Sequence, residues 1–183
     1  MGHGSGHFGR SRRGREVPAL LALADRHRFE RLRSRVMRPL RATALVALLA
    51  LDRATKIWAA ASLKTVGTIA LIPFFDLTYV ENTGAAFGMG RGANKLLTAV
   101  SVGLVIALQV MRRRWPKDDR WLQWGALLVT AGAVGNIYDR LAFGYVVDFL
   151  HIHHWPVFNM ADSCISIGAV MLAWGMKDEP AKP

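Results

Sequence analysis

The chain has 183 residues, of which 52% are hydrophobic and 20% are charged, and its formal net charge is +11. The apolar content excludes a largely disordered chain, and the single cysteine, Cys164, excludes an internal disulfide framework and a cysteine-based zinc site. A basic nucleic-acid-binding domain is seldom this apolar, whereas a small membrane protein with its positive charge on one side of the bilayer combines both properties.

Residues 1–36 differ in composition from the rest of the chain. They hold nine arginines and three acidic residues, and glycine and serine are frequent at their start. Basic segments with interspersed apolar side chains bind to anionic membrane surfaces, so we expect a disordered or membrane-surface cytoplasmic extension. A mis-called start is an equal alternative, because Met37 directly precedes the first apolar stretch. We predict a membrane domain over residues 37–177 and a cytoplasmic tail over residues 178–183.

Four stretches of apolar residues follow, and each approaches the length of a membrane-spanning helix. About 20 residues are needed to cross a hydrocarbon core of about 30 Å, and the first stretch is interrupted by charged side chains between Asp52 and Lys56. Four such stretches are hard to place in the core of a soluble protein of this length. We therefore predict an all-α integral membrane protein with four transmembrane helices. The stretches are residues 42–63, 92–111, 121–138 and 158–176.

Basic residues mark one side of this predicted bundle. Eighteen of the 24 lysines and arginines lie in residues 1–41, in residues 112–120 or near the C-terminus. With four spans these three clusters fall on the same side of the membrane, which the positive-inside rule identifies as cytoplasmic. The prediction is a multi-pass protein with both termini in the cytoplasm (N-in/C-in).

Two segments face the opposite, extracytoplasmic side in this topology. Apolar and polar residues partly alternate over residues 76–81, which predicts a small β element resting on the outer membrane surface. Residues 141–157 are rich in aromatic residues and histidine, which predicts a short interfacial segment. His151, His153 and His154 could form a metal cluster, but aromatic segments of this kind are more often only interfacial. We therefore expect no metal.

Four aspartates lie within or beside the predicted spans: Asp52, Asp139, Asp148 and Asp162. An ionisable side chain at the centre of a membrane helix costs roughly 2.5–3.5 kcal/mol on insertion scales, so any single one is most simply an interfacial residue that reaches water. The predicted topology, however, places all four in the outer half of the membrane or at its interface. Four carboxylates from different elements at similar depth favour a shared polar site.

Amide side chains accompany these carboxylates. Asn136 and Asn159 each lie three residues before an aspartate, so each pair shares a helix face, and Asn82 follows the β element. Two carboxylates in one site keep a proton between them, which lets one activate water while the other polarises a peptide carbonyl. The residues therefore indicate a pair of the aspartic-protease type, and their spacing leaves open which two of the four aspartates form it.

Five short segments resemble, in the same order, the signature blocks of the bacterial lipoprotein signal peptidase family, also called signal peptidase II. One block alone would be a weak signal, whereas five blocks in family order are highly specific. The long basic extension before Met37 departs from the family pattern, and it touches none of the motif positions. The blocks are Leu51–Lys56 (LDRATK), Glu81–Phe87 (ENTGAAF), Gly135–Arg140 (GNIYDR), Val146–Phe149 (VVDF) and Phe158–Ser163 (FNMADS).

The resemblance implies an aspartic endopeptidase of the bacterial cytoplasmic (inner) membrane, with its active site at the extracytoplasmic face. Such enzymes remove the signal peptide from diacylglyceryl-modified prolipoproteins and cut just before the lipidated cysteine. We accordingly expect prolipoprotein substrates and membrane lipids as partners, no cofactor, no nucleic acid and a monomeric protein.

The motifs also imply roles for single residues. Asp148 and Asp162 would be the catalytic pair, Arg140 would contact the substrate backbone, and Asp139 would be structural although it looks equally buried. The positions expected to bind substrate or support the site are Asn82, Gly84, Asn136, Asp139, Arg140, Asn159, Asp52 and Lys56.

Two other functions fit parts of the sequence. A small membrane transporter or proton-relay protein also uses intramembrane carboxylates, but it predicts acidic residues at many depths, whereas these gather towards one side. A nucleic-acid-associated membrane protein would use the N-terminal arginines. Neither alternative accounts for the five blocks. Cys164 has no histidine placed by motif to activate it, so a cysteine nucleophile is not indicated.

Overall fold

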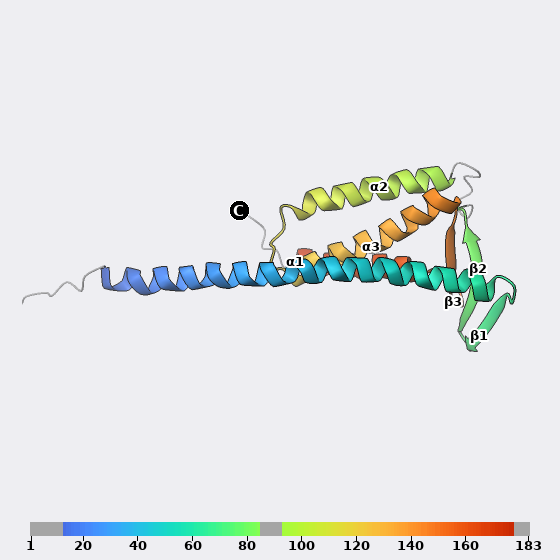
Figure 1. Cartoon of the computed structure of the whole chain (residues 1–183), viewed down its shortest axis with the longest axis horizontal. Coiled ribbons are helices and arrows are strands. Elements are labelled where there is room, and N and C mark those ends of the chain that lie inside the picture. Colours follow the sequence, from blue (N-terminus) through green and yellow to red (C-terminus); the bar gives the residue numbers. More distant parts are fainter. Residues whose placement is uncertain (1–12, 85–92, 178–183) are drawn as a thin grey trace, which may run out of the picture. The chain divides into compact units, whose positions relative to one another are not determined.

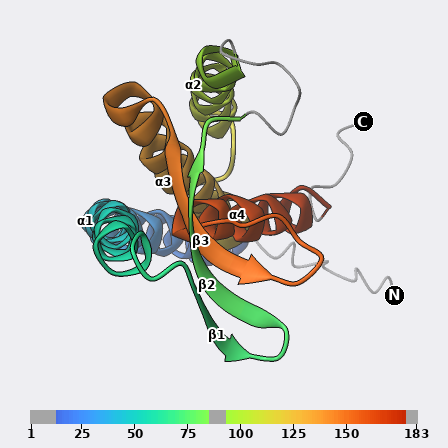
Figure 2. The ribbon, with the colours of Figure 1, turned by 90° about the vertical axis from the view of Figure 1, so that its right-hand side faces the viewer.

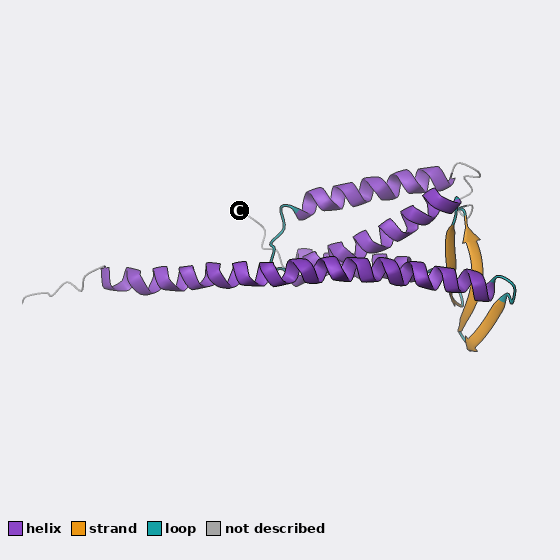
Figure 3. Ribbon diagram, in the orientation of Figure 1, coloured by secondary structure: helices purple, strands orange, loops and turns teal. Residues whose placement is uncertain are grey.

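The computed structural model describes residues 13–84 and 93–177. The chain divides into two compact units, residues 1–39 and residues 40–183. The described residues of the first unit are helical, and all of the predicted site residues lie in the second unit. The elements are α1 (Arg13–Leu63), β1 (Thr68–Ile72), β2 (Phe75–Asn82), α2 (Ala93–Arg112), α3 (Arg120–Phe143), β3 (Val146–Ile152) and α4 (Met160–Lys177) (Figures 1 and 3).

Some predictions fall outside the described residues. These concern residues 1–12 of the extension, the tail from residue 178, and residues 85–87 of the second motif. The predicted domain boundary at Met37 lies within α1 and stays a prediction.

The prediction of four helices is confirmed, since every predicted apolar stretch lies mostly or wholly within a helix. In the described part of the chain, α2 alone is long and apolar enough to cross a membrane by length and composition. Polar residues lower the mean hydropathy of the other helices: α4, for example, has Asp162 in its first turn and Lys177 in its last. Four membrane spans with both termini in the cytoplasm therefore stay a prediction.

The small β element is a three-stranded antiparallel sheet in the order β1–β2–β3. It lies across one end of α3 and α4 (Figure 2). The sequence predicted a strand at β2 but only an interfacial segment where β3 forms. Residues Val146–Phe149 of β3 are all buried, so the strand lacks the alternation of polar and apolar residues that marks a half-buried strand.

Glycines bring α3 and α4 into close contact. A Cβ atom added to Gly125 would lie 2.9 Å from the carbonyl oxygen of Gly168, and one added to Gly168 would lie 2.7 Å from the carbonyl oxygen of Gly125. A Cβ atom on Gly132 would overlap the carbonyl oxygen of Ala161. Small residues of this kind let helix backbones approach each other in an apolar environment. The first turn of α4 is thereby held against α3.

One apolar cluster lies beneath the sheet, where Ala59 and Leu63 of α1 pack against Val147 and Phe149 of β3. A second joins Trp115 to Leu122 and Ala126 of α3. The outer faces of the helices, in contrast, expose large apolar side chains. Examples with exposed fractions of 59–67% are Val46 in α1, Leu104 and Ile106 in α2, and Val170 in α4. Exposed apolar area over several helices is uncommon in soluble monomers and indicates a surface that contacts lipid or protein.

Candidate active site

Asp148 lies in the middle of β3 and is only 2% exposed. Both of its carboxylate oxygens accept hydrogen bonds from amide side chains. Asn82 Nδ2 donates to Oδ2 over 2.9 Å, and Asn159 Nδ2 donates to Oδ1 over 2.7 Å. Asn82 comes from β2, where its neighbour Val80 pairs with Asp148 across the sheet. The sheet and the start of α4 therefore share in placing this carboxylate.

Asp162 lies in the first turn of α4 and forms a reciprocal cap with Asn159. The backbone N–H of Asp162 donates to Asn159 Oδ1 over 2.9 Å, and the backbone N–H of Asn159 donates to Asp162 Oδ2 over 3.2 Å. Asn136 Nδ2 of α3 donates to the other oxygen, Oδ1, over 2.8 Å. The carboxylate of Asp162 therefore lies at the positive end of the α4 helix dipole, where it accepts hydrogen bonds.

Asn159 connects the two carboxylates, because its side chain donates to Asp148 and accepts from the backbone of Asp162. The pKa of Asp148 is raised to about 6, mainly by burial; the hydrogen bond from Asn82 opposes this rise, and the nearby charge of Asp162 adds to it. A buried carboxyl beside a second carboxylate is the arrangement that keeps a proton near neutral pH.

The orientation of Asn82 is set by the turn that follows β2. Asn82 Oδ1 accepts a hydrogen bond from the backbone N–H of Gly84 over 2.8 Å, which leaves its Nδ2 to face Asp148. Gly84 has a φ of +78°, which favours glycine, and a Cβ atom there would lie 2.5 Å from Cδ1 of Leu97 in α2. The glycine thus allows both the turn and the close approach of α2.

A buried ion network lies next to this pair, centred on Lys56 of α1. The fully buried Lys56 Nζ lies 2.9 Å from Asp52 Oδ2 and 2.9 Å from Asp139 Oδ2, and it donates to Asn136 Oδ1 over 3.0 Å. Arg53 lies 3.0 Å from the second oxygen of Asp139. Both oxygens of Asp139 are therefore held by cations.

The network also supports the start of α4. Asp52 Oδ1 accepts a hydrogen bond from the backbone N–H of Ala161 over 3.0 Å. The side chain of Asp52 fits in this position because residue 135, which faces it, is a glycine. A Cβ atom on Gly135 would lie 2.6 Å from Asp52 Oδ2. Asn136 joins the network to the aspartate pair, since it accepts from Lys56 and donates to Asp162.

Arg140 follows Asp139 at the end of α3 and is half-buried. Its Nε is buried, and within residues 13–84 and 93–177 it has no hydrogen-bond partner. A buried donor without a partner costs free energy unless a ligand or water satisfies it. Arg140 is thus a group available to bind a ligand.

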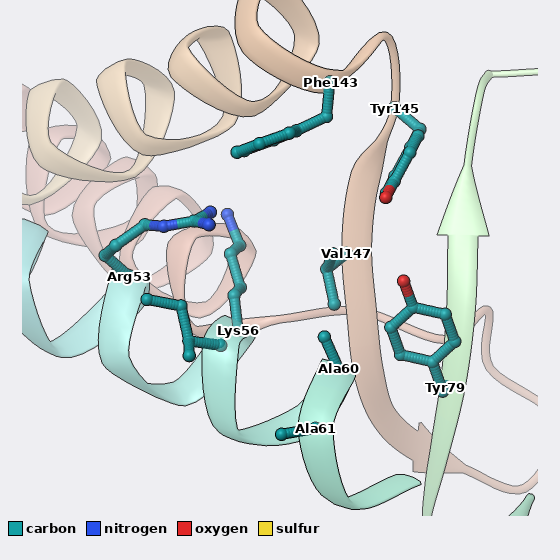
Figure 4. A pocket seen from close by; sticks show the side chains of 9 residues that line it. Arg53, Lys56, Ala60, Ala61, Tyr79, Phe143, Tyr145 and Val147 are labelled. Carbon is teal, nitrogen blue, oxygen red and sulfur yellow. The ribbon is translucent and has the colours of Figure 1, made fainter. Parts of the chain in front are cut away.

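A pocket of about 400 Å³ lies on the other side of β3 (Figure 4). Val147 lines it, and because side chains alternate along a strand, Asp148 faces away from it. Arg53 and Lys56 reach into it from α1, opposite Phe143 and Tyr145 (Figure 4). The pocket thus borders the ion network rather than the aspartate pair.

The structure joins all of the predicted site residues except Arg140 into one chain of hydrogen bonds and ion pairs, from Gly84 to Asp52. Arg53 also belongs to this network, through Asp139, and was not among the predicted site residues. A signal was present, because Arg53 lies three residues before Lys56 on one helix and therefore near the same face.

Comparisons with known proteins agree with this geometry. Residues 44–177 match the family described as Signal peptidase (SPase) II. The chain is 43% identical over 128 residues to a lipoprotein signal peptidase of Clostridium acetobutylicum, a match that covers 67% of this chain and 83% of the relative. It is 41% identical over 135 residues to one of Thermodesulfovibrio yellowstonii, covering 69% and 87%. A solved structure described as a bacterial membrane enzyme aligns with a TM-score of 0.68 and 29% identity over 76% of this chain and 94% of that one.

Proposed function

The chain belongs to the signal peptidase II family, and from this premise we propose that Asp148 and Asp162 are its catalytic pair. As a member of that family it is an aspartic endopeptidase that cleaves the signal peptides of prolipoproteins. This function replaces the alternative of a transporter or proton relay. The observation that carries the proposed pair is Asn159, whose side chain and backbone hold both carboxylates at once.

The surroundings of the two aspartates suggest different roles. Asp162 faces the N-terminus of α4 and an amide donor, so it is the carboxylate that takes a proton from water. Asp148, whose pKa is raised to about 6, is the group that keeps a proton and donates it to the oxygen of the scissile carbonyl. A substrate that excludes water from the pair raises the pKa of Asp148 further.

The resulting step is balanced in atoms and protons. Water attacks the carbonyl carbon while Asp162 accepts a proton from that water and Asp148 gives its proton to the carbonyl oxygen. Collapse of the tetrahedral intermediate breaks the peptide C–N bond, the leaving amine receives the proton held by Asp162, and the hydroxyl proton returns to Asp148. Arg140, whose Nε lacks a partner among the described residues, binds a backbone carbonyl of the substrate.

The location of the site follows from the surface of the helices. We propose that α2, α3, α4 and the second half of α1 span the bacterial cytoplasmic membrane, with the sheet at the extracytoplasmic face. The exposed apolar side chains on the helices support this, and so do the 18 basic residues predicted on the opposite side. The substrate is then a diacylglyceryl-modified prolipoprotein, cut just before its lipidated cysteine by a monomeric enzyme.

The proposal is tested by the cleavage of a diacylglyceryl-modified prolipoprotein by the purified protein and by Asp148→Asn and Asp162→Asn separately. We expect each variant to lose at least about 100-fold in turnover, because each removes one of the two proton-transfer groups. Asp118→Asn is the matched control, since Asp118 is exposed in the loop between α2 and α3. Near wild-type turnover in either of the first two variants would refute the assignment of the pair.

A further inference from the structure

Three side chains that are not part of the aspartate pair or the ion network meet at the far end of the β2–β3 ladder. Asp76 Oδ2 lies 2.9 Å from His153 Nε2 and 3.5 Å from His151 Nδ1. The three atoms lie within 4.8 Å of one another. Asp76 is only 9% exposed, and within the described part of the chain the basic side chains at its carboxylate are these two imidazoles, with no lysine or arginine among them.

The sheet brings these groups together by its register. Asp76 of β2 is paired directly with His151 of β3, so their side chains are neighbours. His153 follows two residues later, on the same face of the chain as His151, and its backbone N–H donates to the carbonyl oxygen of Phe74 over 3.1 Å. Asp148 lies on the opposite face of β3. The cluster is thus fixed by backbone pairing and is separate from the catalytic face.

The donor set suits a transition metal ion. Two imidazoles and one carboxylate are a common ligand set for zinc and other divalent first-row metals, whereas Ca²⁺ and Mg²⁺ prefer oxygen ligands alone. Two ligand atoms that each lie 2.0–2.1 Å from a tetrahedral zinc ion are about 3.3 Å apart. The observed separations of 2.9 Å and 3.5 Å lie on either side of that value.

We propose that Asp76, His151 and His153 form a binding site for a divalent transition metal ion, typified by Zn²⁺. The sequence favoured an interfacial segment because aromatic segments with histidines are more often only interfacial; the sheet adds a carboxylate ligand, Asp76, from a strand that is distant in the sequence. The bound ion connects β2 and β3, the two strands that carry Asn82 and Asp148.

The bound metal ion would have a structural role, because the pairing of β2 with β3 is irregular close to its ligands. The pairing of β2 with β3 shifts between Leu77 and Val80, and the latter is the partner of Asp148. The metal ligands lie on the other side of this irregularity. A metal there fixes the pairing of the two strands just before the point at which the ladder shifts towards the catalytic carboxylate.

The test measures metal binding by the full chain, purified without a histidine tag and stripped with a chelator. ZnCl2 is titrated in competition with a chromophoric chelator, and Co²⁺ is used to record the absorption bands of its coordination. We expect the wild-type chain to bind Zn²⁺ at this site, and His151→Gln, His153→Gln and Asp76→Asn each to weaken that binding at least tenfold. An excess of Ca²⁺ or Mg²⁺ should not displace the ion.

His154→Asn is the matched control, because His154 is adjacent to the cluster but not part of it. Its φ is +70°, which asparagine tolerates well. The histidines of the first 36 residues are present in every variant, so the differences between variants isolate the cluster. The proposal is overturned if all variants bind Zn²⁺ as the wild type does, or if His154→Asn weakens binding as much as His153→Gln.

A second measurement, the unfolding midpoint with and without Zn²⁺, distinguishes the loss of the metal site from misfolding of a variant. His153 is the most exposed ligand, with a side chain that is 44% exposed, so His153→Gln should fold normally. Added Zn²⁺ should raise the unfolding midpoint of the wild-type protein and not that of His153→Gln, since a ligand stabilises only the state that binds it. Equal shifts in both proteins would contradict the site. None of these measurements depends on peptidase activity.

Discussion

Two groups of buried or half-buried carboxylates lie side by side in this protein, and they differ in what faces their oxygens. Asp52 and Asp139 face the cations Lys56 and Arg53. Asp148 and Asp162, in contrast, are held mainly by amide donors, from asparagine side chains and the backbone.

The difference supports the proposal that Asp148 and Asp162 are the catalytic acids and that Asp139 is structural. A cation at contact distance pairs with the charge of a carboxylate, whereas an amide holds the carboxylate in place without neutralising its charge. The two oxygens of Asp139 lie 3.0 Å and 2.9 Å from cationic nitrogens of Arg53 and Lys56. In the pair held by amides, burial raises the pKa of Asp148, and one acid that keeps a proton is what the proposed mechanism requires.

The largest effect is expected on stability, from Lys56→Met. The variant leaves Asp52 and Asp139 buried without their shared cation, and removing one partner of a buried ion pair costs about 3–5 kcal/mol. Unfolding of the purified protein in detergent measures the loss. Lys95→Met is the control, because Lys95 is exposed on α2. Equal stability of the two variants would mean that the network does not hold the fold.

The variants Asp139→Asn and Asp148→Asn test whether the two groups of carboxylates have different roles. We expect Asp148→Asn to lose at least about 100-fold in turnover with little change in unfolding midpoint, because it removes a proton-transfer group and also a buried charge. Asp139→Asn should show the reverse, with a lower midpoint and measurable turnover, because it weakens the ion pairs with Lys56 and Arg53. Cleavage assays and thermal unfolding on the same samples decide between these patterns.

The raised pKa of Asp148 predicts a pH dependence of stability. The folded pKa is about 6 and the unfolded value is close to 3.8, so between these values the folded state binds more protons than the unfolded state. The free energy of unfolding then falls as pH rises through that window. From pH 4 to pH 7 the wild type should lose about 2–3 kcal/mol relative to Asp148→Asn.

This pH dependence is measured as the difference between the two proteins in unfolding free energy at several pH values, which cancels the contributions of other groups. A difference that is flat across the window, or one that rises with pH, would mean that Asp148 is ionised in the folded protein as readily as in the unfolded chain.

The smallest expected effect is a difference in turnover between alanine substitutions at two glycines that share the same backbone conformation. Gly84→Ala and Gly144→Ala both place a side chain at a φ near +80°, which costs about 1–2 kcal/mol in each case. Nothing lies within 4 Å of a Cβ atom on Gly144, whereas one on Gly84 meets Leu97.

Only Gly84→Ala should also lower turnover, by several-fold, because it disturbs the turn that orients Asn82 towards Asp148. Stability and cleavage measured on both variants test this. Equal turnover in the two would show that the orientation of Asn82 does not depend on this turn.

The sequence predicted much of the fold and a set of candidate site residues that the fold brings together. Four helices and the β2 region followed from apolar stretches and alternation, and the motif blocks named ten residues that the structure places on neighbouring elements. The strand β3 was missed because its residues Val146–Phe149 are buried on both faces and show no alternation. The role of Arg53 was missed because its partner Asp139 lies on another helix.

The sequence by itself determined the family, the helices and the identity of the acidic and amide residues, because these are encoded locally in short blocks and in hydropathy. Only the tertiary structure decided which carboxylates face cations and which face amides, since each contact joins residues that are far apart in the chain. It likewise brought Asp76 to His151 and His153 through the register of two strands. Whether a carboxylate is structural, catalytic or metal-binding depends on the groups within about 4 Å of its oxygens, and folding alone brings those groups together.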